Sequence, residues 1–445
     1  MINIATVSLG CPKNTVDTEV MLGNLGEKGF SITSEAIKAE VIIVNTCGFI
    51  ESAKKESINT ILEFAEYKKG KCQVLIVTGC LVQRYKKELV QQIPEIDGII
   101  GTGEYDKIVD CIEANLQGTK FEKTDNLEFL YDHNTPRLLS TPKHTAYVKI
   151  AEGCDNHCTY CIIPKLRGGY RSRPIESIVK EVKNLTDGGV KEIILVAQDT
   201  TVYGMDLYGE YKLADLLIQL NEIEGVKWIR IMYCYPTYLS DTLLQTIASL
   251  DKVVNYIDLP LQHGDNEILK RMGRKEKVED LIALVKKIRA YIPDVVIRTS
   301  LIVGFPGETD ENFSNLMDFV KTIRLDRVGV FTYSPEEETP AYDYPNKVPK
   351  RKKVLRQHKL MKEQRKISKE INEGWIGRTI DVMIESMQGD NLVGRSFRDS
   401  PEIDGNVVIP IKKETHNLIG EIKPVKITKA FDYDLLGEFD YESCK

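Results

Sequence analysis

Short apolar runs alternate with amphipathic helical stretches along most of this chain, and this alternation is the feature that most constrains its fold. The first expected strands, rich in Val and Ile, are residues 3–9, 41–46 and 74–78. Helical stretches such as 15–28 and 49–69 separate them. Because parallel strands need a crossover to bring the chain back, the pattern predicts a parallel sheet covered by helices. We place this first domain at residues 1–118 and a polar linker at 119–143.

A second series of the same kind fills the middle of the chain. Its expected strands are residues 146–151, 192–197, 228–233, 256–259, 295–303 and 328–333. Since a closed barrel of this type needs eight strand–helix units, six units predict an open (β/α)6 barrel, which we place at residues 144–346. We expect its chemistry at the carboxyl ends of the strands.

The last part of the chain changes character twice. Residues 347–373 hold 11 basic and three acidic residues, a net charge of +8, and are expected to form one connecting helix. That helix is either a solvated connector or a nucleic-acid contact. Beyond it, apolar and polar residues alternate with a period of two, which predicts a small antiparallel β-barrel at residues 374–445. The expected fold class is therefore α/β, with a separate C-terminal β-barrel.

Whether the cysteines form disulfides or bind metal depends on the cell compartment of the protein. The chain of 445 residues has no apolar run approaching the roughly 18 residues that a membrane span needs, and no secretory leader precedes its first strand. We therefore expect a cytoplasmic protein with no membrane partner. Thiols are kept reduced there, so clusters among the 10 cysteines are more simply metal ligands than disulfides.

The strongest motif is a C-x3-C-x2-C run formed by Cys154, Cys158 and Cys161, directly after the first strand of the expected barrel. Three thiolates are one short of a closed structural zinc site, whereas an iron–sulfur cluster held by three cysteines leaves one iron free for another ligand. His157 is the alternative fourth ligand for zinc, but it lies within the same tight loop. The spacing favours the iron–sulfur cluster.

A second set of three cysteines is dispersed in the sequence but follows the expected strands. Cys11, Cys47 and Cys80 each come just after a strand of the N-terminal sheet. In a parallel sheet these positions share the carboxyl edge, where ligands of open α/β sheets bind. Any one of them alone would be read as a small buried apolar residue, but three equivalent positions predict a second three-cysteine metal site. The cysteines expected to be unliganded are Cys72, Cys111, Cys234 and Cys444, with Cys234 facing the active site as the alternative.

These motifs resemble those of a known family. The three-cysteine run, with Tyr160 before its last cysteine, resembles the cluster motif of radical S-adenosylmethionine (SAM) enzymes. Both cysteine sets and the terminal barrel together resemble the methylthiotransferases of that superfamily, along essentially the whole chain. The resemblance implies two 4Fe-4S clusters, S-adenosyl-L-methionine as cofactor, and a C-terminal barrel of the TRAM type.

The resemblance also implies a division of labour. The cluster of the barrel would generate a 5'-deoxyadenosyl radical that activates a carbon, and the N-terminal cluster would hold sulfur that is methylated and transferred as CH3–S. Gly304, at the end of the fifth barrel strand, is a candidate cradle for the adenosine, with a simple turn as the alternative. Making the radical requires no catalytic acid or base, and we name none.

The substrate is the harder question. Residues 8–14, Ser-Leu-Gly-Cys-Pro-Lys-Asn, resemble the branch that modifies a ribosomal protein, and we expect the transfer-RNA branches to differ at Pro12 and Lys13. The segment 374–445 has a net charge of −4, which suits a basic partner better than phosphate. Acidic residues concentrated near its end are Asp432, Asp434, Glu438, Asp440 and Glu442, and simple surface solubility is their alternative reading.

The expected function is β-methylthiolation of an aspartate in small-subunit ribosomal protein twelve, within or near the small ribosomal subunit. It would require an external electron donor and a sulfur source. One alternative is methylthiolation of adenosine in transfer RNA, which the basic segment 347–373 favours. The alternative of another class is a non-enzymatic iron–sulfur carrier or RNA-binding protein.

Overall fold

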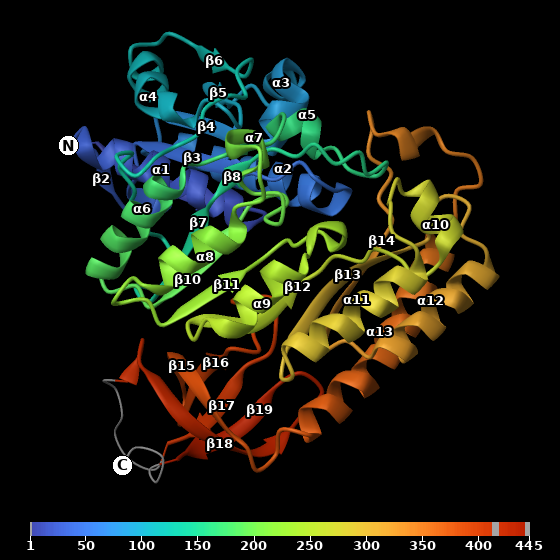
Figure 1. The fold of residues 1–445 in the computed structure, drawn as a ribbon. Coiled ribbons are helices and arrows are strands. Elements are labelled where there is room, and N and C mark those ends of the chain that lie inside the picture. Colours follow the sequence, from blue (N-terminus) through green and yellow to red (C-terminus); the bar gives the residue numbers. More distant parts are fainter. Residues whose placement is uncertain (1, 412–417, 441–445) are drawn as a thin grey trace.

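The computed structural model describes residues 2–411 and 418–440, and the chain forms three bodies in sequence order (Figure 1). The N-terminal α/β domain and the small C-terminal barrel lie at opposite ends, with the open barrel between them. Two residues named above, Glu442 and Cys444, lie outside the described residues. None of the described helices has the length and apolar character that crossing a membrane requires.

The N-terminal domain is a six-stranded parallel sheet with strand order β2-β1-β3-β4-β5-β6. Its strands are β1 (Asn3–Ser8), β2 (Ser31–Ile32), β3 (Val41–Thr46), β4 (Val74–Gly79), β5 (Gly98–Ile100) and β6 (Phe121–Lys123). Its helices are α1 (Pro12–Glu27), α2 (Glu51–Ala65), α3 (Cys80–Gln92) and α4 (Ile108–Leu116). Every residue of β3 and β4 is buried, as Val- and Ile-rich strands covered on both faces must be. The edge strand β6 falls within the segment expected to be a linker.

The middle body is an open sheet of six parallel strands in the order β7-β10-β11-β12-β13-β14. The described strands β7 and β14 do not pair, which confirms the expected open (β/α)6 architecture. Its strands are β7 (Thr145–Lys149), β10 (Glu192–Val196), β11 (Trp228–Ile231), β12 (Val253–Asp258), β13 (Val296–Val303) and β14 (Arg327–Thr332). Its covering helices are α6 (Ile175–Asp187), α8 (Leu213–Asn221), α9 (Asp241–Ser249), α11 (Val278–Tyr291) and α12 (Asp310–Ile323).

Short elements decorate the barrel's carboxyl edge. A hairpin of β8 (Ala151–Glu152) and β9 (Arg171–Ser172) follows the first barrel strand and encloses the C-x3-C-x2-C loop. Three short helices are α5 (Ile163–Arg167), α7 (Met205–Tyr208) and α10 (Asn266–Arg271). The hairpin holds the cysteine loop over the end of β7, where the barrel is expected to carry its chemistry.

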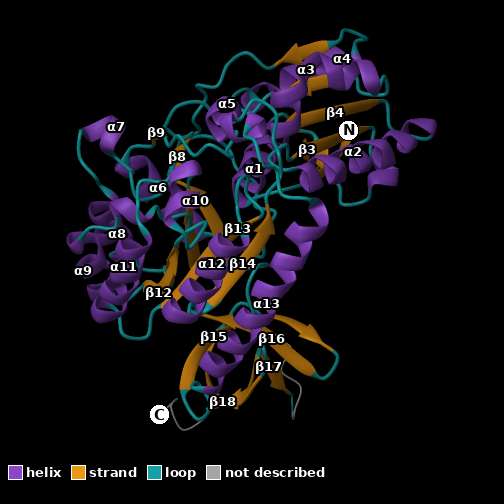
Figure 2. Ribbon diagram, turned by 90° about the vertical axis from the view of Figure 1, so that its right-hand side faces the viewer, coloured by secondary structure: helices purple, strands orange, loops and turns teal. Residues whose placement is uncertain are grey.

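A long helix, α13 (Lys350–Glu373), packs on β14 and α12 and leads into the C-terminal barrel (Figure 2). That barrel is closed, in the order β15-β16-β17-β19-β18, and confirms the expected small terminal β-barrel. Its strands are β15 (Thr379–Gln388), β16 (Asn391–Ser396), β17 (Val407–Pro410), β18 (Ile422–Ala430) and β19 (Leu435–Phe439). Its pairings are antiparallel except that β17 and β19 run parallel.

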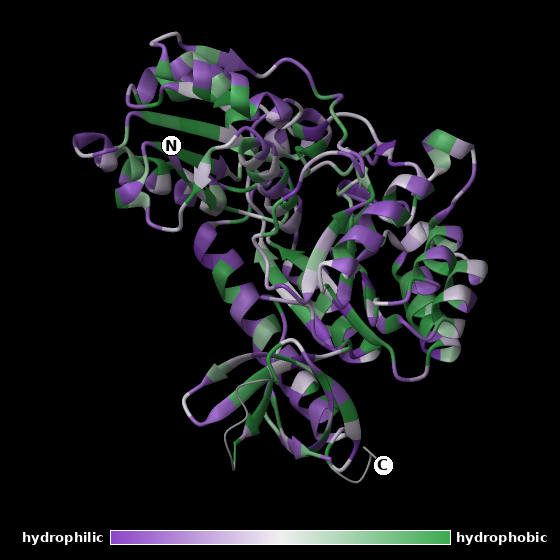
Figure 3. Ribbon diagram, turned by 90° about the vertical axis from the view of Figure 1, so that its left-hand side faces the viewer, coloured by the Kyte–Doolittle hydropathy of each residue, from purple (hydrophilic) through white to green (hydrophobic). Residues whose placement is uncertain are grey.

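Apolar residues gather on the strands and on the helix faces that cover them (Figure 3). One apolar cluster is shared by all three bodies. It joins Ile4 and Met21 of the N-terminal domain to Ile194 and Val296 of the open barrel and to Met383 of the small barrel. Burial of apolar area is the main favourable term in folding, so this shared cluster stabilises the three bodies as one unit.

Candidate functional site

The N-terminal cysteines lie at one edge of the sheet, because the strands that they follow are neighbours. Cys11 caps the start of α1 after β1, Cys47 follows β3, and Cys80 is the first residue of α3 after β4. The order β1-β3-β4 therefore brings all three to the carboxyl edge of adjacent strands. This is the arrangement on which the prediction of a second metal site was based.

Glycines beside these cysteines let the loops approach one another closely. A Cβ atom on Gly10 would lie 2.7 Å from Cβ and 3.1 Å from Sγ of Cys47, which is too close for any other residue. A Cβ on Gly48 would lie 2.8 Å from the backbone carbonyl of Cys80. Asn14 ties two of the loops together, because its Nδ2 donates to the carbonyl oxygens of Leu9 at 2.9 Å and Thr46 at 3.0 Å.

The thiols of this edge act on one another electrostatically. Burial, followed by repulsion from Cys80 and Cys11, raises the pKa of Cys47 to about 12. Burial also raises the pKa of Cys80, against the attraction of the Arg167 guanidinium, whose Nη2 lies 3.5 Å from the Cys80 Sγ. Thiols that repel one another as thiolates are the donors that a cationic iron centre favours, since metal binding relieves that repulsion. The donor set fits an iron–sulfur cluster.

The barrel triplet lies on the loop between β8 and α5. The backbone N–H of Cys154 donates to the Gly168 carbonyl at 3.1 Å, and that of Cys161 donates to the Cys158 carbonyl at 3.1 Å, so the loop is closed by its own backbone. Burial raises the pKa of Cys154 to about 11, and burial and repulsion from Cys158 raise the pKa of Cys161. This triplet has the same donor chemistry as the first.

In the described part of the chain, no three His, Cys, Asp or Glu side chains are already drawn in to metal-ligand geometry. The loops place the three cysteines of each triplet in the same region, but their thiols are not yet at metal-ligand positions. His157, the alternative zinc ligand, is exposed. The assignment of the six cysteines as ligands thus remains a prediction that rests on position and donor chemistry.

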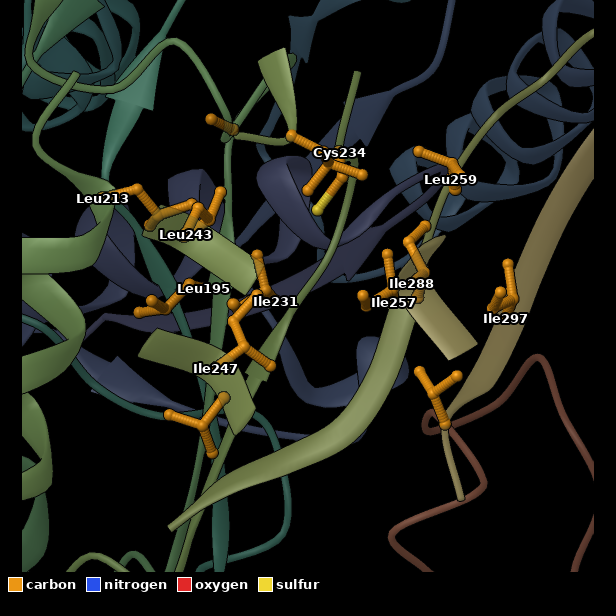
Figure 4. Packing of buried hydrophobic residues seen from close by; sticks show 14 of the residues in the cluster. Leu195, Leu213, Ile231, Cys234, Leu243, Ile247, Ile257, Leu259, Ile288 and Ile297 are labelled. Atoms are coloured by element: carbon orange, nitrogen blue, oxygen red, sulfur yellow. The ribbon is translucent and has the colours of Figure 1, made fainter. Parts of the chain in front are cut away.

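Cys234 lies elsewhere. Its side chain is 2% exposed and packs among Ile231, Leu243 and Leu259 in the apolar layer between the barrel sheet and its helices (Figure 4). Its Sγ lies 3.7 Å from the Thr200 hydroxyl. A thiol in such surroundings is an apolar core residue, and this position argues against the alternative in which it faces the active site.

A network of buried charges joins the two cysteine edges. Lys149 of β7 is fully buried, and its Nζ donates to Asp17 of α1 and to Glu152 of β8, each at 2.5 Å. Arg167 of α5 donates through Nη1 to the same two carboxylates, at 2.7 and 3.2 Å. Its Nη2 donates to Asn14 Oδ1 at 2.6 Å, beside Cys80. The network therefore links the hairpin of the barrel triplet directly to the N-terminal cysteine edge.

Lys13 is a second buried cation at this boundary. Its Nζ lies 3.3 Å from the centre of the Tyr233 ring and 3.5 Å from the Ala197 carbonyl oxygen, so it reaches from α1 to the ends of two barrel strands. Burial alone would lower the pKa of Lys13, but the attractions of Tyr233 and Cys11 outweigh it and raise the pKa. The ammonium also acts on Cys161 of the other triplet.

Gly304 follows β13 with φ of +74°, and its amide is already engaged. Its N–H donates to Glu308 Oε2 at 2.5 Å, and a Cβ atom there would lie 2.3 Å from Cγ of Lys353. Glycine is required for this turn and for the close approach of α13. Its role in cradling adenosine stays a prediction.

Sequence reasoning did not assign roles to the buried charges. Their burial depends on partners that are distant in the chain: Asp17 and Lys149 are 132 positions apart. The one available signal is Lys149 within the otherwise apolar expected strand 146–151, because an unpaired buried charge at such a position is rarely tolerated.

Family models match all three bodies of the chain. Residues 148–320 match the radical SAM superfamily, residues 3–101 match the uncharacterized protein family UPF0004, and residues 376–439 match the TRAM domain. Membership of the radical SAM superfamily implies a 4Fe-4S cluster and SAM.

Among solved structures, the chain is similar to the radical SAM methyltransferase TsrM from Kitasatospora setae, which holds cobalamin and a 4Fe-4S cluster. The TM-score is 0.56 at 12% identity, with 76% of this chain and 73% of that one covered. A second structure of TsrM, with tryptophan and a SAM analogue bound, gives a TM-score of 0.55 at 14% identity, covering 87% of this chain and 79% of that one. At these identities the likeness shows the fold alone.

Curated relatives are much more similar. Proteins named ribosomal protein uS12 methylthiotransferase RimO are 53% identical in Desulforamulus reducens, covering 98% of this chain and 99% of the relative. The corresponding protein of Clostridioides difficile is 50% identical, covering 99% and 100%. That of Lachnoclostridium phytofermentans is 49% identical, covering 97% and 98%. At such identity over nearly the full length, the chain belongs to the RimO family of radical SAM methylthiotransferases.

Proposed function

We propose that this protein transfers a methylthio group to the β-carbon of an aspartate in ribosomal protein uS12. The names of relatives that are 49–53% identical along nearly the whole chain support uS12 as the substrate. The proposal includes two 4Fe-4S clusters, one on Cys154, Cys158 and Cys161 and the other on the N-terminal triplet of Cys11, Cys47 and Cys80. We propose further that the protein acts in the cytoplasm, near the small ribosomal subunit, with an external electron donor and sulfur source.

One observation carries the two-cluster proposal: the two triplets come from different domains whose edges are bridged by buried charges. Arg167 contacts Cys80 in one domain and belongs to the helix that directly follows Cys161 in the other. When bound, the clusters and SAM supply a hydrogen-abstracting radical on one side and a held sulfur on the other. In this proposal the target carbon is bound at the boundary between the two triplets, where it can meet both.

The residues of the chain have distinct tasks in this scheme. Each triplet offers three thiolates, which leaves one metal position open to a further ligand. Asp17, Glu152 and Lys149 fix α1 against the hairpin that carries the barrel triplet. Because these groups are almost fully buried, their mutual attractions are little screened by water. They therefore tie the two edges to one another.

Variants of single cysteines test this function. In anaerobically reconstituted protein given SAM, reductant, sulfide and uS12, we expect one methylthio group on one aspartate, located by mass spectrometry. Cys158→Ala removes a ligand of the barrel triplet and should abolish 5'-deoxyadenosine. Cys47→Ala should retain 5'-deoxyadenosine but lose the modified aspartate. Both variants should bind about half of the wild-type iron.

Cys111→Ala is the matched control, because Cys111 is a buried cysteine like Cys47 but belongs to α4 and packs in the apolar core. It should keep the iron content and the product of the wild type. Modified adenosine in transfer RNA, with uS12 unchanged, would overturn the proposed substrate. An unaltered iron content in Cys47→Ala would overturn the second cluster.

A further inference from the structure

Lys13 stands out among the buried cations at the boundary of the two domains because no carboxylate of the described residues pairs with it. Its side chain is 7% exposed. Within residues 2–411 and 418–440, its ammonium contacts the Tyr233 ring and the Ala197 carbonyl and makes no ion pair. Nearby Lys149 and Arg167 are each neutralised by both Asp17 and Glu152. Among the residues that the structure describes, Lys149 and Arg167 thus have acidic partners and Lys13 has none.

The position of Lys13 in its helix is also unfavourable. It is the second residue of α1, and no acidic residue lies in that first turn. The N-terminus of a helix carries a partial positive charge, which repels a cation there. Burial of an ammonium without a counter-charge adds a desolvation cost. A residue that carries several unfavourable energy terms together is commonly kept because it has a functional role.

Tyr233, whose ring contacts the ammonium of Lys13, has a strained backbone conformation. Tyr233 has φ of +61°, which is rare for a residue with a side chain, and its N–H donates to Asp258 Oδ2 at 3.0 Å. Such strain persists where the surroundings fix it, commonly at functional sites. Asp258 is already paired with Arg298 at 2.8 Å, so it does not serve as the counter-charge of Lys13.

Lys13 follows Cys11 by two positions, and its ammonium reaches the Tyr233 ring and the Ala197 carbonyl at the carboxyl ends of β11 and β10. It therefore lies at the boundary between the N-terminal cysteine edge and the barrel, where the target carbon is placed under the proposed function, and the inference rests on that function. The β-carbon of an aspartate is one bond from its carboxylate. This carboxylate supplies the acidic partner that Lys13 lacks among the described residues, and its binding places the adjacent carbon between the two sites.

We propose that Lys13 binds the carboxylate of the target aspartate and so selects a carboxylate-bearing substrate. Tyr233 orients the ammonium by contact with its ring, as aromatic faces do for cations. The methylthio group replaces a hydrogen on the β-carbon and leaves the carboxylate intact. Lys13 thus takes no part in bond making, and its contribution is binding and specificity.

Binding of uS12 without turnover tests the inference. Reconstituted enzyme, without SAM, is titrated with uS12 and with uS12 in which the target aspartate is replaced by asparagine. The wild type should bind the aspartate form about 10- to 100-fold more tightly, the range for one hydrogen bond to a charged group. Lys13→Gln should bind both forms equally, and Lys13→Arg should retain part of the preference.

Lys165→Gln is the matched control. It removes a cation four positions beyond Cys161 that is exposed and already paired with Glu338, so the wild-type preference should remain. The iron content and the electron paramagnetic resonance signals of Lys13→Gln should equal those of the wild type.

Two results would overturn the inference while the proposed function stands. One is a Lys13→Gln variant that keeps the preference for aspartate. The other is a Lys13→Gln variant that loses the N-terminal cluster, which would make Lys13 a support for that cluster. If instead the wild type modifies transfer RNA and ignores uS12, the proposed function fails and this inference falls with it.

Discussion

At the scale of single residues, buried ion pairs join the N-terminal domain to the open barrel. Lys149 is the centre of this arrangement, because it contacts Asp17 from one domain and Glu152 from the other. Replacing it by Met leaves two carboxylates buried with only Arg167 to neutralise them. Removal of one partner from a buried ion pair typically costs about 3–5 kcal/mol. We expect a loss of that size in the free energy of unfolding of Lys149→Met, measured by urea denaturation.

A surface pair provides the comparison. Lys191 binds Glu421 at 2.8 Å, but both side chains are partly exposed. Lys191→Met should lower the free energy of unfolding by less than about 1 kcal/mol. Equal losses in the two lysine variants would contradict the assignment of Lys149 as the joint between the domains.

The cysteine positions could be predicted from the sequence, and the buried charges could not. Cys11, Cys47 and Cys80 follow apolar runs whose period identifies them as strands, so topology alone brings the residues to one edge. The pairing of Lys149 with Asp17 depends on how two domains dock, which no local pattern encodes. The strain at Tyr233 is also hidden, because its N–H is bound by Asp258, which lies 25 positions further along the chain.

At the scale of elements, helix α13 shows why a basic run need not bind nucleic acid. Arg356 is buried and binds Glu308 at 2.7 Å and Asp310 at 2.8 Å. Lys353 donates to the Tyr333 carbonyl at 2.8 Å. These contacts attach the first half of the helix to the open barrel, which favours the interpretation as a connector. The length of the run predicted a helix, but only the packed structure distinguishes its internal charges from its surface charges.

Charge reversal on the exposed face of α13 tests this interpretation. Lys359 and Lys362 are exposed, so the double variant Lys359→Glu, Lys362→Glu should leave the rate of uS12 modification within about twofold, as for ordinary surface substitutions. The rate is measured at two salt concentrations. A loss of tenfold or more that grows as salt is lowered would give the helix a role in binding phosphate.

At the scale of the whole molecule, the small barrel inserts charged residues into the base of the open barrel. Arg395 of β16 binds Glu192 of β10 at 2.6 Å, and Asp399 binds Arg327 of β14 at 2.6 Å. Asp404 accepts a hydrogen bond from the Tyr256 hydroxyl at 2.6 Å. The sequence gives no sign of these contacts, because the partners of Arg395, Asp399 and Asp404 lie in another domain.

Glu192 makes this docking sensitive to pH. Its burial alone would raise its pKa, but Arg395 and Arg230 outweigh that effect and lower the pKa from 4.5 to about 2. A carboxylate whose pKa is lower in the folded state stabilises fully above pH 4.5 and loses that contribution as the pH falls toward 2. The contribution at neutral pH is about 3 kcal/mol. Glu192→Gln removes the titrating group and leaves two arginines short of a partner.

The free energy of unfolding of the apo-protein, measured by urea denaturation from pH 7 to pH 3, should therefore differ between the wild type and Glu192→Gln. Glu192→Gln should be about 3–5 kcal/mol less stable than the wild type at pH 7, because buried arginines lose their counter-charge. The difference should shrink steadily below pH 4.5, where the wild-type carboxylate begins to take up its proton. Glu224→Gln, at an exposed position, should follow the wild-type curve at every pH. A gap between Glu192→Gln and the wild type that stayed constant down to pH 3 would mean that the docking of the small barrel does not depend on this carboxylate.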